Sequence, residues 1–276
     1  MRAVIFDGKK FAAEKEKILA TEFAVLRSKG TVPKLVFVLA GESEEAEFYV
    51  GLKEKMAKRL GVDFEIKRFG KETAEKTIAS YINICSRDAG VWGITFEYPL
   101  PDELEKTLPK FLPPAKDIDC LGPENLGRLV LGDYFVLPST VRAILEILTA
   151  RDALLSRYLR GKPVCLVGWG TLVGRPLAIV LKNLGATLTI CDSKTRNLAT
   201  KTREAEILIS ATGIPGLIKK EMVKKGAVVI DAGYPKGDVE LEVIQVASFL
   251  TPVPGGLGPV TITSLFENLL DLINKV

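Results

Sequence analysis

The stretch Gly161–Ser193, GKPVCLVGWGTLVGRPLAIVLKNLGATLTICDS, decides the fold. Val164–Val167 is a short apolar run typical of a buried strand, and it leads into the glycine turn Gly168-Trp169-Gly170. An apolar pattern of helical spacing follows, and Thr187–Cys191 then reads as a second strand that ends at Asp192. The order strand, glycine turn, helix, strand, acid predicts one unit of a parallel α/β sheet.

This unit is also a candidate dinucleotide site. Its glycines allow the backbone to approach a pyrophosphate at the positive end of the helix, and an acid about 20 residues further on binds ribose hydroxyls. The spacing is G-x-G-x-x-x-G, one residue longer than the usual fingerprint, and the alternative is that these glycines only form a tight turn. The predicted cofactor-binding residues in this unit are Gly168, Trp169, Gly170, Val173, Asp192 and Ser193. Further along the chain they are Thr212, Gly213 and Tyr234.

Composition limits the class of protein. With 276 residues, of which 47% are hydrophobic, the chain can bury a large core and is long enough for about two domains. The 38 Lys+Arg against 34 Asp+Glu give a net charge of only +4, without a basic block interleaved with aromatics, so we expect no nucleic-acid partner. No apolar run approaches the ~20 residues that cross a bilayer, and we expect a cytoplasmic protein with no membrane partner.

The chain contains no histidine. This excludes a Ser-His-Asp or Cys-His nucleophile, a His-ligated zinc and a histidine general base. Proton chemistry must then be carried by Lys, Tyr, Asp or Glu, and no metal site is predicted.

The first half of the chain alternates strands and helices. The expected order is β-α-β-α-β, which predicts an α/β layer structure with its own sheet, and the expected strands are Lys34–Ala40, Val62–Phe69 and Val91–Phe96. Glu44–Leu60 and Ala74–Cys85 are the helices between them. Ligands in such sheets bind beyond the carboxyl ends of the strands, which here lead into residues 41–43 and 97–101.

The second half repeats the alternation after a long irregular segment. Residues 112–133 are rich in proline and glycine and are expected to form a packed, irregular loop. Pro138–Arg151 then predicts a helix that bridges the two halves. Further strands are expected at Glu206–Ala211 and Ala227–Ile230, with a short basic helix ending at Lys225 between them and a final amphipathic helix to Val276.

Several motifs resemble the bifunctional methylenetetrahydrofolate dehydrogenase/cyclohydrolase family, and the resemblance covers nearly the whole chain. A single motif of this kind can occur in an unrelated protein by chance, but the combination of motifs in one order and at one spacing is not expected by chance. The motifs are Tyr49-Val-Gly-Leu-Lys53 followed by Lys55, Lys116-Asp-Ile-Asp119, Asn125-Leu-Gly-Arg-Leu129, Val173-Gly-Arg-Pro176 and Thr251-Pro-Val-Pro-Gly-Gly-Leu-Gly-Pro-Val-Thr261.

The resemblance implies two α/β domains with a catalytic cleft between them, a folate-binding catalytic domain at 1–140 and 255–276 and a Rossmann-type NAD(P)-binding domain at 141–254. It implies a homodimer. It also implies oxidation of 5,10-methylenetetrahydrofolate to the 5,10-methenyl form with NAD(P)+, then hydrolysis to 10-formyltetrahydrofolate, in the one-carbon metabolism that serves purine biosynthesis. Tetrahydrofolate is the substrate carrier.

The family's site residues carry over onto matching positions. Tyr49 and Lys53 lie four apart on one helix face, so both can project into one cleft; the plain alternative is a solvated face. Lys53 is the expected catalyst of hydrolysis and Tyr49 the ring that stacks on folate. Asp119 suits the amino-pyrimidinone edge of the pterin, because a carboxylate accepts two parallel hydrogen bonds. Pro254, Gly255 and Gly256 form the expected contact with the substrate.

Two departures from the family affect the expected activity. Glu97 stands where glutamine is usual, and a carboxylate near Lys53 stabilises its ammonium form, so cyclohydrolase activity is expected to be weak or shifted to higher pH. Trp169 removes a cation for the 2′-phosphate of NADP and Asp192 adds a carboxylate, which favours NAD although the family norm is NADP. Arg175 and Arg196 remain able to reach that phosphate.

Three alternatives stay open from the sequence. The first is a dehydrogenase with weak or no cyclohydrolase activity. The second is a shikimate- or amino-acid-type dehydrogenase with the same two-domain plan, which leaves Tyr49, Lys53 and the Pro254 loop unexplained. The third is a non-catalytic folate- or dinucleotide-binding protein, against which the presence of Lys53 and Asp119 argues.

Overall fold

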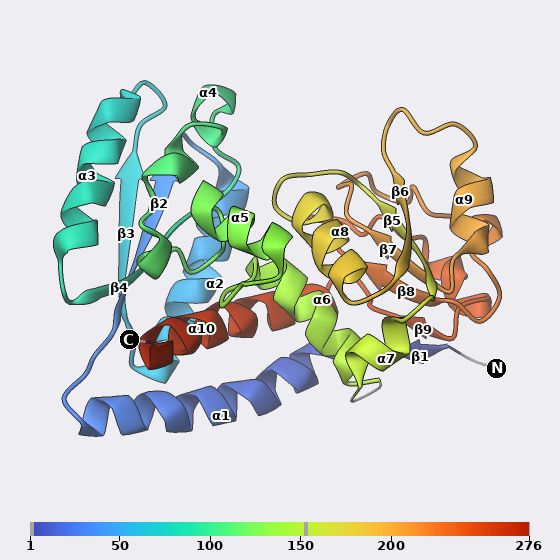
Figure 1. Cartoon of the computed structure of the whole chain (residues 1–276), viewed down its shortest axis with the longest axis horizontal. Coiled ribbons are helices and arrows are strands. Elements are labelled where there is room, and N and C mark those ends of the chain that lie inside the picture. The colour runs from blue at the N-terminus through green and yellow to red at the C-terminus, as the bar shows by residue number, and fades with distance from the viewer. Residues whose placement is uncertain (1–2, 152–153, 276) are drawn as a thin grey trace. The chain divides into compact units, whose positions relative to one another are not determined.

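A computed structural model describes residues 3–151 and 154–275 and divides the chain into two compact units (Figure 1). Unit 1 contains Met1–Ala12 and Ser139–Thr261, and unit 2 contains Ala13–Pro138 and Ile262–Val276. Both are α/β structures with parallel sheets, as the alternating patterns predict.

The sheet of unit 2 has three strands in the order β3-β2-β4. The strands are β2 (Lys34–Ala40), β3 (Asp63–Phe69) and β4 (Val91–Phe96), and all pair in parallel. Helices α2 (Glu44–Leu60) and α3 (Glu75–Arg87) lie on opposite sides of this sheet (Figure 1). Because both faces of the central strand are covered, six of its seven residues are buried, which explains its unbroken apolar sequence.

The main core of unit 2 also uses both long helices near the ends of the chain. Phe23 of α1 (Gly8–Ser28) and Phe266 of α10 (Leu257–Lys275) are fully buried, with their rings 6.5 Å apart in an edge-to-face arrangement. Each helix begins in unit 1 and continues into unit 2.

The segment 112–133 is more regular than the sequence predicts. It contains η2 (Pro114–Lys116) and the helix α5 (Pro123–Leu131), so the expectation of an irregular loop was wrong for those residues. Proline at the first helical turn and Gly132, whose φ is 75°, are ordinary start and stop signals of a helix. The remaining short elements of unit 2 are α4 (Asp102–Glu105) and η1 (Leu108–Phe111).

The sheet of unit 1 has six parallel strands in the order β1-β9-β8-β7-β5-β6. Helices α8 (Gly174–Asn183) and α9 (Leu198–Glu204) lie on opposite sides of it (Figure 1), which is the doubly wound arrangement expected from the opening stretch. The strands are β1 (Val4–Ile5), β5 (Pro163–Val167), β6 (Thr187–Cys191), β7 (Ile207–Ser210), β8 (Val228–Asp231) and β9 (Phe249–Leu250).

Two features of unit 1 differ from expectation. Residues 1–12 group with unit 1 because β1 pairs with β9, and residues 255–261 group with it as well, whereas both ranges were assigned to the folate domain from the sequence. The basic helix expected to end at Lys225 is only one 3-10 turn, η3 (Lys220–Met222). The other elements are α6 (Ser139–Thr149), α7 (Leu155–Leu159) and η4 (Leu241–Gln245).

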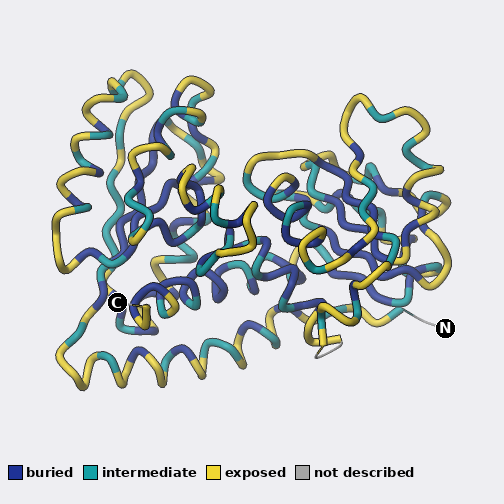
Figure 2. Tube along the Cα trace, viewed as in Figure 1, coloured by how far each residue is buried: buried dark blue, intermediate teal, exposed yellow. Residues whose placement is uncertain are grey.

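Burial follows the sheets (Figure 2). The strands β2, β5, β7 and β8 are almost entirely buried, while α1 alternates buried and exposed residues along its length. None of the helices in the described ranges is both long and apolar enough to span a membrane.

Candidate functional site

Helix α2 fixes the two residues that the sequence pairs, Tyr49 and Lys53. Ser43 caps the start of the helix, because its side chain accepts a hydrogen bond from the backbone N–H of Ala46 at 3.2 Å. Gly61 caps its end in the left-handed conformation, with a φ of 69°. Tyr49 and Lys53 are both half-buried and lie one turn apart on this helix.

Lys53 forms a buried ion pair with Glu97. The Lys53 Nζ donates a hydrogen bond of 2.7 Å to Glu97 Oε2, and the two side chains are only 12% and 8% exposed. The same ammonium lies 5.2 Å from the centre of the Phe37 ring. Burial raises the pKa of the Glu97 carboxyl, while the charge and hydrogen bond of Lys53 oppose that shift. The structure thus brings Lys53 into contact with Glu97, the acid that stands where glutamine is usual in the family.

Asp119 lies on a turn that is held by a buried acid which sequence reasoning missed, Asp117. The Asp117 carboxylate accepts hydrogen bonds from the backbone N–H groups of Leu121 (3.0 Å) and Gly122 (2.9 Å) and from the Asn125 side chain (3.0 Å). Asp119 is half-buried, and its charge adds to the increase that burial causes in the pKa of Glu97. The signal for Asp117 is the repeated acid in Lys116-Asp-Ile-Asp119.

The residue after Asp119 has an unusual backbone. Cys120 is 1% exposed and has a φ of 52°, in the left-handed region that disfavours side chains. The turn that carries Asp119 therefore includes a strained residue, and such strain persists only where surrounding contacts impose it.

The glycine turn of unit 1 follows β5 as predicted. Gly168 has a φ of 113°, and its N–H donates to the Cys191 carbonyl at 2.8 Å. A side chain at Gly174 would overlap the Gly168 carbonyl, so the start of α8 packs directly on the turn. Val173 precedes this helix. The bare backbone at the N-terminal end of α8 fits the phosphate groups of a dinucleotide.

Two residues at this edge bear on the choice between NAD and NADP. Asp192 follows β6, and its Oδ1 accepts hydrogen bonds from the Lys194 N–H at 2.9 Å and the Thr195 hydroxyl at 3.2 Å. Trp169 is 40% exposed, and its carbonyl accepts a hydrogen bond from Arg175 Nε at 3.2 Å. The Arg175 side chain consequently lies against the glycine turn. Ser193 is exposed beside Asp192.

The ends of β7 and β8 are joined by a pair of buried aspartates that the sequence did not single out. Asp238 Oδ2 accepts from the Ser210 hydroxyl at 2.8 Å and from the Thr212 N–H at 2.7 Å. Asp231 accepts from the N–H groups of Gly233 (2.8 Å), Asp238 (3.1 Å) and Val239 (3.0 Å). We call Asp231 and Asp238 the aspartate brace.

The aspartate brace organises the predicted cofactor residues Thr212, Gly213 and Tyr234. It fixes the backbone after β7 directly through Thr212 and encloses the loop that carries Tyr234. Desolvation raises the pKa of Asp231 to about 6, and the charge of Asp238 adds to this increase. The hydrogen bonds from the three backbone N–H groups lower the same pKa but do not cancel the effect of burial. An acid at each end of the loop Asp231-Ala-Gly-Tyr-Pro-Lys-Gly-Asp238 is the sequence signal for this arrangement.

Pro254, Gly255 and Gly256 follow β9 at the same edge of the unit 1 sheet. The Gly8 N–H donates to the Gly255 carbonyl at 3.0 Å, and the Gly256 N–H donates to the Pro252 carbonyl at 2.8 Å. These residues belong to unit 1, whereas Tyr49, Lys53 and Asp119 belong to unit 2. In the described part of the chain, no group of three or more Cys, Asp or Glu side chains is arranged to hold a metal ion.

Two family models match the chain. Residues 6–119 match the tetrahydrofolate dehydrogenase/cyclohydrolase catalytic domain, and residues 138–276 match the NAD(P)-binding domain of the same name. Together they cover both the buried ion pair and the glycine turn.

Similar proteins cover almost the whole chain. The bifunctional protein FolD of Exiguobacterium sp. is 39% identical over 281 residues, which is 99% of each chain. The crystal structure of the Campylobacter jejuni FolD enzyme, a methylenetetrahydrofolate dehydrogenase/cyclohydrolase, has a TM-score of 0.93 at 32% identity and covers 99% of this chain and 100% of that one. The Trypanosoma brucei FolD, complexed with NADP cofactor and inhibitor, has a TM-score of 0.92 at 31% identity and covers 100% and 98%.

Proposed function

The chain belongs to the tetrahydrofolate dehydrogenase/cyclohydrolase family, and we propose from this that Lys53, Glu97 and the carboxyl edge of the unit 1 sheet carry its two reactions. The enzyme oxidises 5,10-methylenetetrahydrofolate to 5,10-methenyltetrahydrofolate with a nicotinamide dinucleotide. It then hydrolyses the product to 10-formyltetrahydrofolate. The observation that carries the proposal is the hydrogen bond of 2.7 Å between Lys53 and Glu97.

The proposed folate residues are Tyr49, Lys53 and Asp119, with Pro254, Gly255 and Gly256. Tyr49 offers a ring to the flat pterin from the helix turn that precedes Lys53, and Asp119 offers a carboxylate to its amino-pyrimidinone edge. The buried carboxylate of Asp117 supports this assignment, since it orders the turn on which Asp119 lies.

Hydrolysis requires water to add to the methenyl carbon and a ring C–N bond to break. Lys53 is the proposed proton carrier, because no histidine is present and its ammonium is held at a defined place by Glu97. Glu97 engages the Nζ of Lys53 in a charge-assisted hydrogen bond of 2.7 Å, so we propose that this enzyme hydrolyses less efficiently at neutral pH than it oxidises.

Oxidation needs the substrate and the dinucleotide to be held in register rather than a protein base. When bound, the nicotinamide ring supplies the hydride acceptor. We propose that Gly168, Gly170 and the N-terminal end of α8 bind the pyrophosphate, and that Thr212, Gly213 and Tyr234 contact the nicotinamide end.

We further propose that NAD is preferred to NADP. Asp192 places a carboxylate at the end of β6, where the adenosine ribose binds in doubly wound folds, and Trp169 supplies no positive charge there. The positive charge of Arg175 would favour NADP instead, but the Nε of this side chain donates to the Trp169 carbonyl.

The test is the absorbance of reduced cofactor when the protein is mixed with methylenetetrahydrofolate and either NAD or NADP. We expect turnover with both and a higher kcat/KM with NAD. Replacing Asp192 by Ser removes the repelling charge, and the expected result is a kcat/KM for NADP that rises about tenfold, equivalent to roughly 1.4 kcal/mol. A strong NADP preference in the unmodified protein would contradict the cofactor proposal, and no turnover with either cofactor would contradict the catalytic one.

A further inference from the structure

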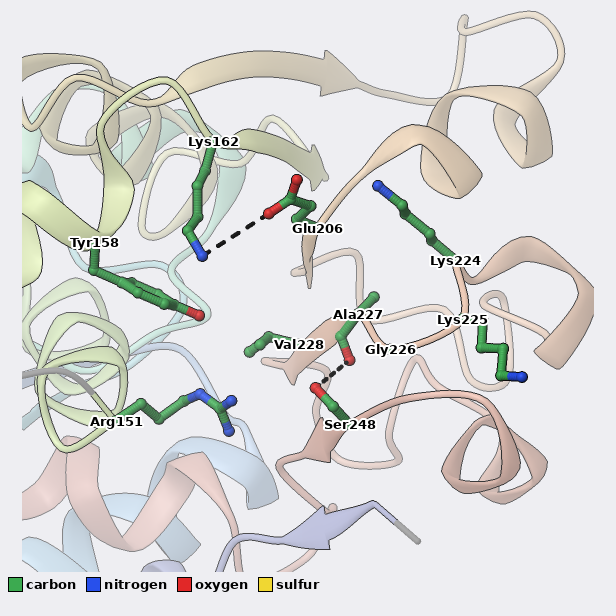
Figure 3. Close-up of a pocket in the computed structure, with 10 residues that line it drawn as sticks. All are labelled: Arg151, Tyr158, Lys162, Glu206, Lys224, Lys225, Gly226, Ala227, Val228 and Ser248. Atoms are coloured by element: carbon green, nitrogen blue, oxygen red, sulfur yellow. Dashed lines mark hydrogen bonds and ion pairs between the residues drawn. The ribbon is translucent and has the colours of Figure 1, made fainter. Parts of the chain in front are cut away.

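A cavity of about 400 Å³ opens in unit 1 away from the cofactor residues (Figure 3). Lys162 directly precedes β5, Val228 begins β8 and Ser248 directly precedes β9, so the cavity lies at the amino ends of these strands. Since every strand of the sheet is parallel, the glycine turn and the aspartate brace lie at the opposite edge. The cavity is therefore separate from the proposed dinucleotide site.

The lining of this cavity is strongly basic. Among the described residues that line it, Glu206 is the one acid, against four cationic residues, namely Arg151, Lys162, Lys224 and Lys225. The cations come from three separate segments of unit 1, because Arg151 follows α6, Lys162 precedes β5, and the other two precede β8. A single run of basic residues on one exposed helix would not produce this arrangement.

Three donor groups face a common space in Figure 3. The guanidinium of Arg151, the ammonium of Lys162 and the hydroxyl of Tyr158 point toward the middle of the cavity, whereas the ammonium of Lys225 points away from it. The Ser248 hydroxyl donates to the Ala227 carbonyl at 3.3 Å. Val228 forms part of the floor. A cluster of donors with an apolar floor is a recurrent plan for sites that bind small charged molecules.

Aromatic rings support the two central cations. The guanidinium carbon of Arg151 lies 4.4 Å from the centre of the Phe249 ring, and the Nζ of Lys162 lies 3.9 Å from that of Tyr158. Stacking on a ring leaves the N–H groups at the edge of a guanidinium able to donate hydrogen bonds. The Phe249 ring thus orients the guanidinium of Arg151 without using its donors.

The acid in the cavity does not neutralise these groups. The Lys162 Nζ is 3.8 Å from Glu206 Oε2, which is longer than a hydrogen bond, and the Glu206 side chain is 46% exposed. An ion pair of that length and exposure contributes little and can be exchanged for a better acceptor.

We propose that this cavity binds the phosphate group of a small metabolite other than the dinucleotide. A guanidinium offers two parallel hydrogen bonds to a phosphate, while the ammonium of Lys162 and the hydroxyl of Tyr158 offer single ones to its remaining oxygens. The volume lies within the range of about 300–1,000 Å³ that is usual for small-molecule sites, so there is room for the ester as well as the phosphate. The proposal does not depend on the activity at the other edge of the sheet.

Isothermal titration of the full chain with inorganic phosphate and with glycerol 3-phosphate tests this site. Saturating NAD occupies the cofactor edge, and sodium chloride keeps the ionic strength constant. We expect both ligands to bind to the unmodified protein. In Arg151→Ala and Lys162→Gln the affinity should fall at least about tenfold, and in Glu206→Gln it should rise.

Lys225→Ala is the matched control, because it removes one positive charge from a side chain of the same lining that points away from the cavity. It should change the affinity less than about twofold. Equal losses in Lys225→Ala and Lys162→Gln would reveal only a diffuse positive field and would overturn the proposal, as would the absence of binding by either ligand. Lys162→Gln keeps the test decisive if Arg151→Ala fails to fold through loss of its contact with Phe249.

Discussion

At the scale of single residues, Glu97 is the position that most affects the chemistry. Its buried carboxylate accepts a charge-assisted hydrogen bond of 2.7 Å from Lys53 Nζ, where a glutamine would offer only the weaker bond of a neutral amide. In Glu97→Gln we expect kcat/KM for hydrolysis at neutral pH to rise about tenfold, while kcat/KM for oxidation changes less than about twofold. Separate assays of methenyltetrahydrofolate loss and cofactor reduction check both values.

The matched control for this substitution is Glu65→Gln, which makes the same change at a carboxylate paired with Lys34. Neither activity should respond to it. An unmodified enzyme that hydrolyses as fast as it oxidises at neutral pH, with no change in Glu97→Gln, contradicts the assigned role of the carboxylate.

Cys120 is a second residue whose effect can be isolated. Its φ of 52° costs a side chain about 1–2 kcal/mol relative to glycine. We expect Cys120→Gly to be more stable than Cys120→Ala by about 1 kcal/mol, measured by urea unfolding, although glycine normally destabilises. At Cys85, inside α3, the same two substitutions should rank in the reverse order. If alanine is at least as stable as glycine at both sites, residue 120 is not strained.

At the scale of elements, the aspartate brace couples the loops after β7 and β8. Burial raises the pKa of Asp231 from an ordinary value of 3.8 to about 6, so the folded protein holds this proton more tightly than the unfolded chain does. The contribution of Asp231 to stability is therefore greatest below pH 3.8 and is lost as pH rises to about 6. The loss is on the order of 3 kcal/mol.

Unfolding by urea at several pH values between 4 and 7 measures this contribution. As pH rises from 4 to 7, the free energy of unfolding of the unmodified protein should fall relative to that of Asp231→Asn, because the asparagine of the variant does not titrate. Asp63→Asn, the same change at an exposed aspartate of β3, should show no such trend. A difference between Asp231→Asn and the unmodified protein that is constant with pH argues against a proton held by the brace.

Individual elements also show what could be predicted from the sequence. The strands β2, β4 and β6 have the predicted limits because a buried parallel strand is a continuous apolar run with clear ends. Helix α5 was missed because Gly127 lies inside it and prolines precede it, and α9 and β9 are short, with seven and two residues. Short elements form through tertiary pairing, which local patterns do not record.

The candidate site was predicted unevenly for a similar reason. The glycine turn was predicted from its spacing, whereas Lys53 and Asp119 were predicted because their motifs resemble those of the family. Asp117, Asp231 and Asp238 act by accepting hydrogen bonds from backbone groups that are brought to them by the fold. A buried aspartate that orders a loop and an exposed one have the same appearance in a sequence.

At the scale of the whole molecule, the homodimer expected from the family resemblance stays a prediction. Light scattering on a sizing column should give about twice the chain mass of 30.1 kDa. The mass should be the same with and without the dinucleotide. A mass near 30.1 kDa at micromolar concentration contradicts the expectation.

The pairing of β1 with β9 also constrains the order in which the protein can be completed during synthesis. Val4 pairs with Phe249, so β1 leaves the ribosome long before its partner strand β9 has been made. Unit 2 likewise lacks Phe266 and Leu269 of its core until α10 has been translated. The two units are interleaved along the chain rather than strung one after the other. Nascent chains of intermediate length should therefore expose unfinished cores in both units and depend on chaperones more than a simple tandem of domains would.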